Sequence, residues 1–165
     1  MIAAARAALL ALLTTEAAFT ADLAALGLGT TGTAVVPKAM KGNRRFEQIG
    51  QEHYPCWLTD AGDLHGASAD GGNGDAAGLS LGSTQQDFTG DIELCLVWHQ
   101  QDYDRSVDQL DALTPALARL LLRHPDLDGA CIQCFLASVQ TDRNYRHPLH
   151  VVAFTVRVVS TISRS

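Results

Sequence analysis

The sequence predicts an α+β fold: a mostly antiparallel β-sheet with an N-terminal helix and a central amphipathic helix packed on one face. Residues 104–124 carry apolar side chains three or four positions apart, which is the period of one helix face. Residues 91–100 alternate between apolar and more polar side chains, and residues 130–141 and 149–162 are rich in β-branched and aromatic types. A strand, a helix and two further strands in that order indicate a sheet covered by a helix.

The composition is that of a single globular domain spanning residues 1–165. Of these residues 47% are apolar and 18% are charged, and this length is sufficient for one substantial core. The formal net charge of -6 argues against a nucleic-acid partner, because phosphate contacts require clustered Lys and Arg. One basic group remains a candidate partner contact, and its alternative is a solvated edge or loop. Its members are Lys38, Lys41, Arg44 and Arg45.

The N-terminal segment is predicted to form one helix. Apolar residues continue at helical spacing from Leu9 to Leu26, and Gly27 then ends the pattern. The apolar run at residues 7–13 has the minimum length of an export signal, but no clean cleavage site follows it. A membrane span requires about 20 apolar residues. We therefore expect a protein with no membrane partner that stays in the cell where it is made.

The glycine-rich segment at residues 27–32 matches the letters of a dinucleotide-binding motif. That motif needs a strand before it and a helix after it, so that the phosphate meets a helix N-terminus. Here the order is reversed, because a helix precedes the segment and an extended run follows it. We interpret it as a turn and predict no cofactor.

A short strand is predicted at residues 56–58, where Pro55 is tolerated at the strand entry. Residues 60–87 differ in composition, since Gly, Asp, Ser and Ala dominate. Such a segment buries too little apolar surface to offset its ordering entropy. It is predicted to be a long loop or a loosely held hairpin, of the kind that binds partners during assembly.

The central helix is expected to begin at Asp104 as its N-cap and to end before Pro125. An interior proline costs roughly 3 kcal/mol, so Pro115 predicts a kink or a fresh helix start with Thr114 as cap. After this helix, residues 130–141 and 149–162 are expected to pair as an antiparallel hairpin.

No catalytic, cofactor or metal residue is predicted, and we expect no enzyme activity. The six histidines have no nucleophile or ligand partner at a recognised spacing. Cys131 and Cys134 have the spacing of a zinc or redox pair, but a strand would point them to opposite faces. With Cys56 and Cys95 they are expected to be buried, reduced thiols.

The layout resembles the tail terminator, or tail completion, proteins of long-tailed bacteriophages and prophages. The resemblance follows the order of segments over the larger part of the chain, including the N-terminal helix. It is carried by residues 55–58 as an early strand, a Gly-rich loop, residues 90–97 as a central strand, residues 110–113 of the helix, residues 125–129 at its exit, and residues 150–156 as a closing strand.

The resemblance implies a homo-hexameric ring that caps the tail tube, ends tube polymerisation and provides the head-tail joining surface. Its implied partners are further copies of itself, the tail tube protein, a neck or head-completion protein, and the sheath. The implied location is the virion, at the top of the tube, after assembly in the host cytoplasm. The candidate contacts are the basic segment and the aspartates of the Gly-rich region, Asp60, Asp63, Asp70, Asp75 and Asp87.

Three alternatives remain open from the residues. The chain would be another head-tail connector or neck subunit with a different partner, an enzyme with a convergent polar pocket, or a free-standing binding module. The binding module predicts a monomer, whereas the tail terminator and the connector subunit both predict a ring.

Overall fold

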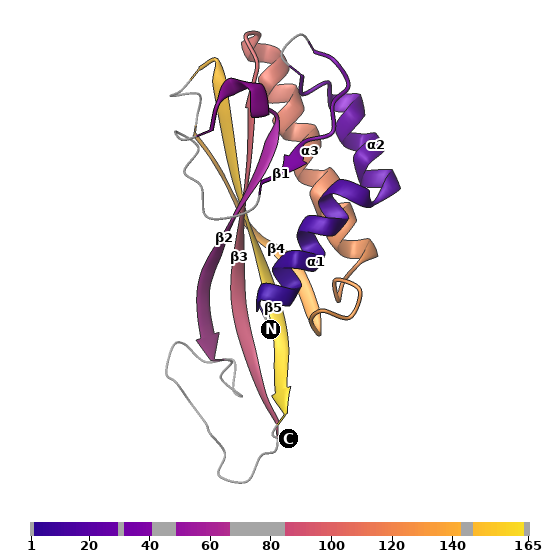
Figure 1. Ribbon diagram of the computed structural model, residues 1–165, viewed down its shortest axis with the longest axis vertical. Helices are drawn as coiled ribbons and strands as arrows, with labels where there is room; N and C mark the ends of the chain where they lie inside the picture. Colours follow the sequence, from indigo (N-terminus) through magenta and orange to yellow (C-terminus); the bar gives the residue numbers. More distant parts are fainter. Residues whose placement is uncertain (1, 30–31, 41–48, 67–84, 143–146, 164–165) are drawn as a thin grey trace.

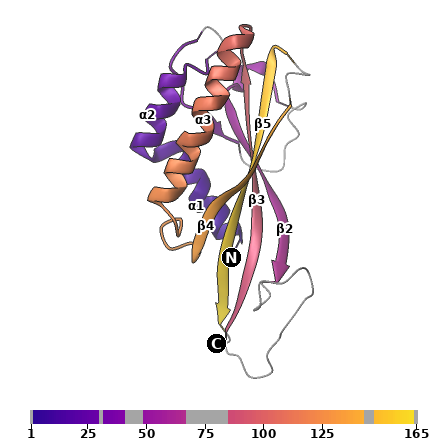
Figure 2. The ribbon, with the colours of Figure 1, turned by 180° about the vertical axis from the view of Figure 1, so that it is seen from behind.

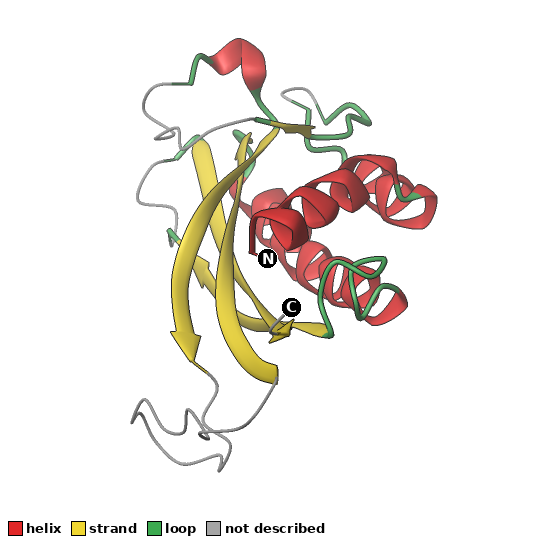
Figure 3. Ribbon diagram, turned by 60° about the horizontal axis from the view of Figure 1, so that its bottom comes forward, coloured by secondary structure: helices red, strands yellow, loops and turns green. Residues whose placement is uncertain are grey.

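The computed structural model describes residues 2–29, 32–40, 49–66, 85–142 and 147–163. Within them, three α-helices pack on one face of a five-stranded sheet (Figures 1 and 3), so the predicted α+β class is confirmed. The elements are α1 (Ile2–Thr15), α2 (Ala17–Leu26), β1 (Lys38–Ala39), a 3-10 helix (Gln51–His53), β2 (Cys56–Gly66), β3 (Gln85–His99), α3 (Tyr103–Arg123), β4 (Gln133–Thr141) and β5 (Leu149–Ser163).

The sheet has the strand order β1-β2-β3-β5-β4. β3 and β5 form its centre, because their antiparallel ladder continues without a break from the pair Gln85 and Ser163 to the pair His99 and Leu149. β2 and β4 pair antiparallel on either side, and β1 adds a short parallel strand to the start of β2. The predicted antiparallel hairpin of the last two strands is therefore confirmed.

The main core lies between the sheet and the helices. Val152, Phe154 and Val156 alternate along β5 and are each fully buried towards the helices. Trp57 of β2 lies between Phe154 and Phe19 of α2, with ring centroids 6.3 Å and 6.4 Å away. The aromatic residues thus join α2 to β2 and β5, the two strands on either side of β3.

A smaller core lies on the opposite face of the sheet. Ile49, Cys56, Leu58 and Val97 are buried together there, next to the segment that contains the 3-10 helix. This cluster covers one end of that face. The other end carries polar pairs such as Asp91 and Arg157, which lie opposite each other on β3 and β5.

The prediction of one N-terminal helix is wrong, because the chain bends by 61° between α1 and α2. Glu16 adopts an extended backbone at the break, and its carboxylate accepts a hydrogen bond from the Phe19 amide. The bend lets Leu13 and Phe19 both reach the core, although a straight helix would satisfy the local periodicity equally well. The predicted stop at Gly27 is confirmed, since this residue has a left-handed backbone (φ 61°).

The central helix differs from the prediction at two points. Asp102 is the N-cap in place of Asp104, and its carboxylate accepts a hydrogen bond from the Arg105 amide at 3.2 Å. α3 also continues through Pro115 as one α-helix, so no fresh helix starts at Thr114. Pro115 is exposed, and water can therefore solvate the carbonyl that loses its amide partner.

The Gly- and Asp-rich region begins later than predicted. The predicted strand at 56–58 is confirmed as the start of β2, but its predicted end is wrong, because β2 continues through residues 60–66. Residues 85–87 belong to β3, which pairs antiparallel with β2, so the hairpin alternative describes the two ends of this region better than a loop. Residues 67–84 lie outside the described residues. Figures 1 and 2 show that β2, β3 and β5 extend beyond the helical layer at the lower end of the molecule.

Candidate assembly surface

The predicted contact residues do not form one cluster. Asp60 and Asp63 lie in β2 and Asp87 lies in β3, so all three belong to strands that extend beyond the helices. Lys38 is exposed in β1, next to Cys56 at the start of β2. The remaining predicted contacts fall outside the described part of the chain: Lys41, Arg44, Arg45, Asp70 and Asp75.

Among the strands whose side chains the structure describes, the outer strand β4 is the most exposed to solvent. Seven of its nine residues are exposed, including the apolar Phe135 (42%) and Val139 (37%). Residues 131–141 contain no charged residue and no proline, which are the groups that usually protect a sheet edge from pairing. A bulge between Leu136 and Ser138 interrupts the strand, and residues 138–141 after it are regular. This edge is suited to receive another strand.

The beginning of the β4 edge is covered. The amide of Cys134 donates to the carbonyl of Pro125 at 2.6 Å, so the turn after α3 occupies this part of the edge. Further along, the amide of Asp142 donates to the carbonyl of Val151 in β5. Because peptide groups alternate in direction along an antiparallel strand, the amides of Val139 and Thr141 point away from β5. The accessible stretch is therefore residues 138–141.

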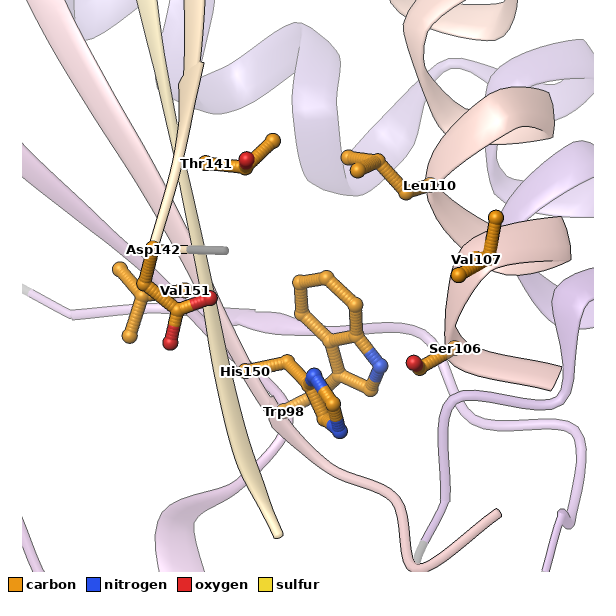
Figure 4. A pocket seen from close by; sticks show the side chains of 8 residues that line it. All are labelled: Trp98, Ser106, Val107, Leu110, Thr141, Asp142, His150 and Val151. Atoms are coloured by element: carbon orange, nitrogen blue, oxygen red, sulfur yellow. The ribbon is translucent and has the colours of Figure 1, made fainter. Parts of the chain in front are cut away.

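A hollow of about 40 Å³ lies between α3 and the β4 edge (Figure 4). Val107 and Leu110 of α3 face Thr141 of β4 across it, and Trp98 lies between the two elements. Val107 is 41% exposed, and Tyr103 one turn earlier is 54% exposed. The full lining is Trp98, Ser106, Val107, Leu110, Thr141, Asp142, His150 and Val151. A strand added to β4 would project every second side chain towards this apolar flank.

Gln109 fixes the position of α3 beside this surface. Its carbonyl oxygen accepts a hydrogen bond from the Trp98 indole at 3.0 Å, and its amide nitrogen donates to the carbonyls of Leu26 and Gly27. The side chain is buried at 3% exposure, so these bonds are shielded from water. One glutamine thus connects β3, α3 and the end of α2.

His150 lies against the other side of Trp98. Their rings stack with centroids 5.4 Å apart, and the imidazole Nε2–H donates to the carbonyl of Gln100 at 3.0 Å. Burial lowers the pKa of His150, although the hydrogen bond to Gln100 and the nearby Asp142 act in the opposite direction. His147 and His99 lower the pKa further. The neutral imidazole is therefore the form that fits this site.

We expect the free energy of unfolding to fall as the pH is lowered through 6.5. Below pH 6.5 the unfolded chain binds a proton at His150 more readily than the folded chain, because burial lowers the pKa of His150 in the folded state. The stability that is present above the unfolded pKa of this residue is therefore lost as the pH falls towards its lower folded pKa. The slope from this residue is at most about 1.4 kcal/mol per pH unit. Urea unfolding at pH values from about 5 to about 8, on either side of the ordinary histidine pKa, measures this slope. A His150→Gln variant with the same pH slope as wild type would contradict this assignment.

The predicted orientation of Cys131 and Cys134 is wrong. Left-handed backbone at Leu127, Asp128 and Gly129 forms a turn, so Cys131 precedes β4 instead of lying within it. The two thiols consequently lie close enough to influence each other's pKa, and the Cys134 thiol donates a hydrogen bond to the carbonyl of His124 at 3.4 Å. Burial, together with the neighbouring Cys131, raises the pKa of Cys134 to about 12. A raised pKa disfavours the thiolate that metal binding and redox chemistry require.

These thiols are expected to react slowly. At pH 8 a thiol with a pKa near 12 is ionised in roughly one molecule in 10⁴, so Cys134 should be alkylated far more slowly than a small free thiol. Cys56, whose pKa burial raises to about 11, should behave similarly. Mass spectrometry after timed iodoacetamide labelling measures the rates, and labelling in urea provides the control. Fast labelling of Cys134 in the folded protein would refute this expectation.

The described residues contain no group of three or more His, Cys, Asp or Glu side chains placed to hold a metal ion. None of the described helices is by itself long and apolar enough to cross a membrane. α1 and α2 reach that length and composition only when taken together across their bend. In both helices, the buried leucines pack in the main core.

Comparison with known proteins adds no relative, because no family model and no curated protein matches the chain.

The surface at β4 was missed by sequence reasoning. Its signal, the absence of charge and proline over residues 131–141, is visible in the sequence. The strand order that makes β4 an edge is not visible there, because periodicity identifies the faces of a strand and not its neighbours.

Proposed function

We propose that this protein is a structural subunit of a long-tailed bacteriophage or prophage, which forms a ring at the top of the tail tube. In this function the ring ends tube polymerisation and presents the surface that joins the tail to the head. Its partners are copies of itself, the tail tube protein and a neck or head-completion protein, with the sheath as a further contact. The ring is a homo-hexamer, as the resemblance of the sequence implies.

The observation that carries the proposal is the exposed and uncharged edge strand β4. Monomeric proteins usually protect such an edge, because it presents unpaired backbone groups to any other chain. An edge that lacks charge and proline is consistent with a protein whose edge is covered by assembly. The α+β layout, with helices on one face of the sheet, agrees with the family that the sequence resembles.

A second feature supports a role in contacts with larger partners. β2, β3 and β5 extend beyond the helical layer, and the predicted contacts Asp60, Asp63 and Asp87 lie in two of these three strands. Strands that project from a compact body can reach a neighbouring molecule without disturbing the core. We assign the extension as the candidate contact with the tube or the neck.

The test is the mass of the purified protein over a range of concentrations, by light scattering and native mass spectrometry. The expected result is a closed hexamer that binds one end of tail tubes and stops their growth when added to polymerising tube protein of the same phage. A ring that ignores tubes but binds the neck protein would favour another connector subunit. A monomer at every concentration, without effect on tubes, would refute the proposal and return the enzyme and binding-module alternatives to consideration.

A further inference from the structure

We infer that neighbouring subunits join by strand addition, with the β4 edge of one copy pairing with the outer side of β2 in the next copy. The inference rests on the proposed function, because it specifies how the ring is closed. A head-to-tail interface of this kind uses two different surfaces of the chain, which is the requirement for a cyclic ring. It would also cover both edges of the sheet by one type of contact.

The β4 side of the interface is residues 138–141. Val139 and Thr141 direct their amides away from β5, as the hydrogen bond from Asp142 to Val151 requires. Val139 is 37% exposed, and the apolar Val107 beside the strand is 41% exposed. An incoming strand would therefore find backbone partners along the edge and apolar contact on its α3 side.

The β2 side is residues 60–66, where the register with β3 is regular up to Ala61 and shifts between Ala61 and Leu64. The carbonyl of Trp57 accepts a hydrogen bond from Met40, which shows that Trp57 directs its peptide groups away from β3. By alternation Ala61 directs its amide the same way, at a position that β1 does not reach. No described strand pairs with this outer side of residues 60–66.

Charge favours this combination of edges. β2 carries Asp60 and Asp63 within residues 60–66, whereas β4 carries no charge. Pairing two β2 edges would bring carboxylates of like charge together, which destabilises a strand pair. Pairing two β4 edges would give a two-fold dimer and leave both β2 edges uncovered. The pairing of β4 with β2 avoids both consequences.

Proline substitutions test each edge separately. Val139→Pro and Ala61→Pro each remove an amide that points out of the sheet, so the ladders within the chain are kept. The matched controls, Val139→Thr and Ala61→Ser, retain the amide. We expect each proline variant to have the mass of one chain and each control to assemble as the wild type does. Circular dichroism checks the fold, and Val139→Lys, which places a charge on the intact edge, is a second variant for β4.

Mixing the two proline variants gives the decisive result. Each variant retains the edge that the other has lost, so an equal mixture should form a complex of two chains, which neither variant forms alone. If either proline variant keeps the wild-type assembly and still stops tube growth, the inference is wrong and the proposed function stands. If Ala61→Pro alone forms a two-chain complex, β4 pairs with β4 and the inference is also wrong. A wild-type chain that remains monomeric would overturn the proposed function itself.

Discussion

Replacing Phe154 with alanine is expected to lower the free energy of unfolding by about 3–5 kcal/mol. The side chain is fully buried and contacts Trp57, which in turn contacts Phe19. Its removal deletes apolar area and leaves a cavity between β5 and the helices, which close packing prevents from collapsing completely. Urea unfolding followed by tryptophan fluorescence measures the change, at a fixed protein concentration because assembly adds to apparent stability.

Phe135→Ala is the matched control for this prediction. Phe135 lies in β4 and is 42% exposed, so its removal creates no enclosed cavity. The expected loss is within about 1 kcal/mol, as for most partly exposed substitutions. Equal losses for Phe154→Ala and Phe135→Ala would mean that the aromatic group around Trp57 does not form the centre of the core.

Replacing Gln109 with alanine is expected to lower the free energy of unfolding by about 3 kcal/mol or more. The substitution leaves the Trp98 indole N–H and the carbonyls of Leu26 and Gly27 without this partner in a buried site. Each buried polar group that loses its hydrogen bond costs roughly 1–3 kcal/mol. The same urea titration measures the loss, and the near-ultraviolet circular dichroism of tryptophan should change with it.

Gln140→Ala is the control for the glutamine prediction, because Gln140 is an exposed residue of β4. The expected change is within about 0.5 kcal/mol. A double variant, Trp98→Phe with Gln109→Leu, removes the indole donor together with its acceptor. It should be more stable than Gln109→Ala, since fewer groups are left unsatisfied. A Gln109→Ala protein as stable as the wild type would contradict the role assigned to this side chain.

The sequence by itself determined the central helix and the strands whose periodicity is strong. The three- and four-residue spacing in α3 reflects burial of one face, so Leu113, Leu117 and Leu120 are found in the core as the pattern requires. The alternation of Ile92, Leu94 and Leu96 in β3 has the same origin, because successive strand residues face opposite sides. In these segments local pattern and tertiary packing agree.

Local signals failed where packing overrode them. The helical periodicity near residue 16 continues through a 61° bend, because Leu13 and Phe19 both reach the core only when the chain turns. Composition predicted a loop from residue 60, yet β2 continues to Gly66 because the neighbouring β3 supplies its hydrogen bonds. The cysteine pair was misplaced because a left-handed turn delays the start of β4.

Only the tertiary structure decided the features on which the candidate assembly surface depends. Whether β4 lies at an edge follows from the strand order, which is set by long-range pairing with β5. The absence of charge at residues 131–141 can be read from the sequence, but it identifies an exposed sheet edge only once the strand order is known. The physical reason is that a residue pattern encodes which side of an element is buried, whereas the neighbours of that element depend on contacts distant in the chain.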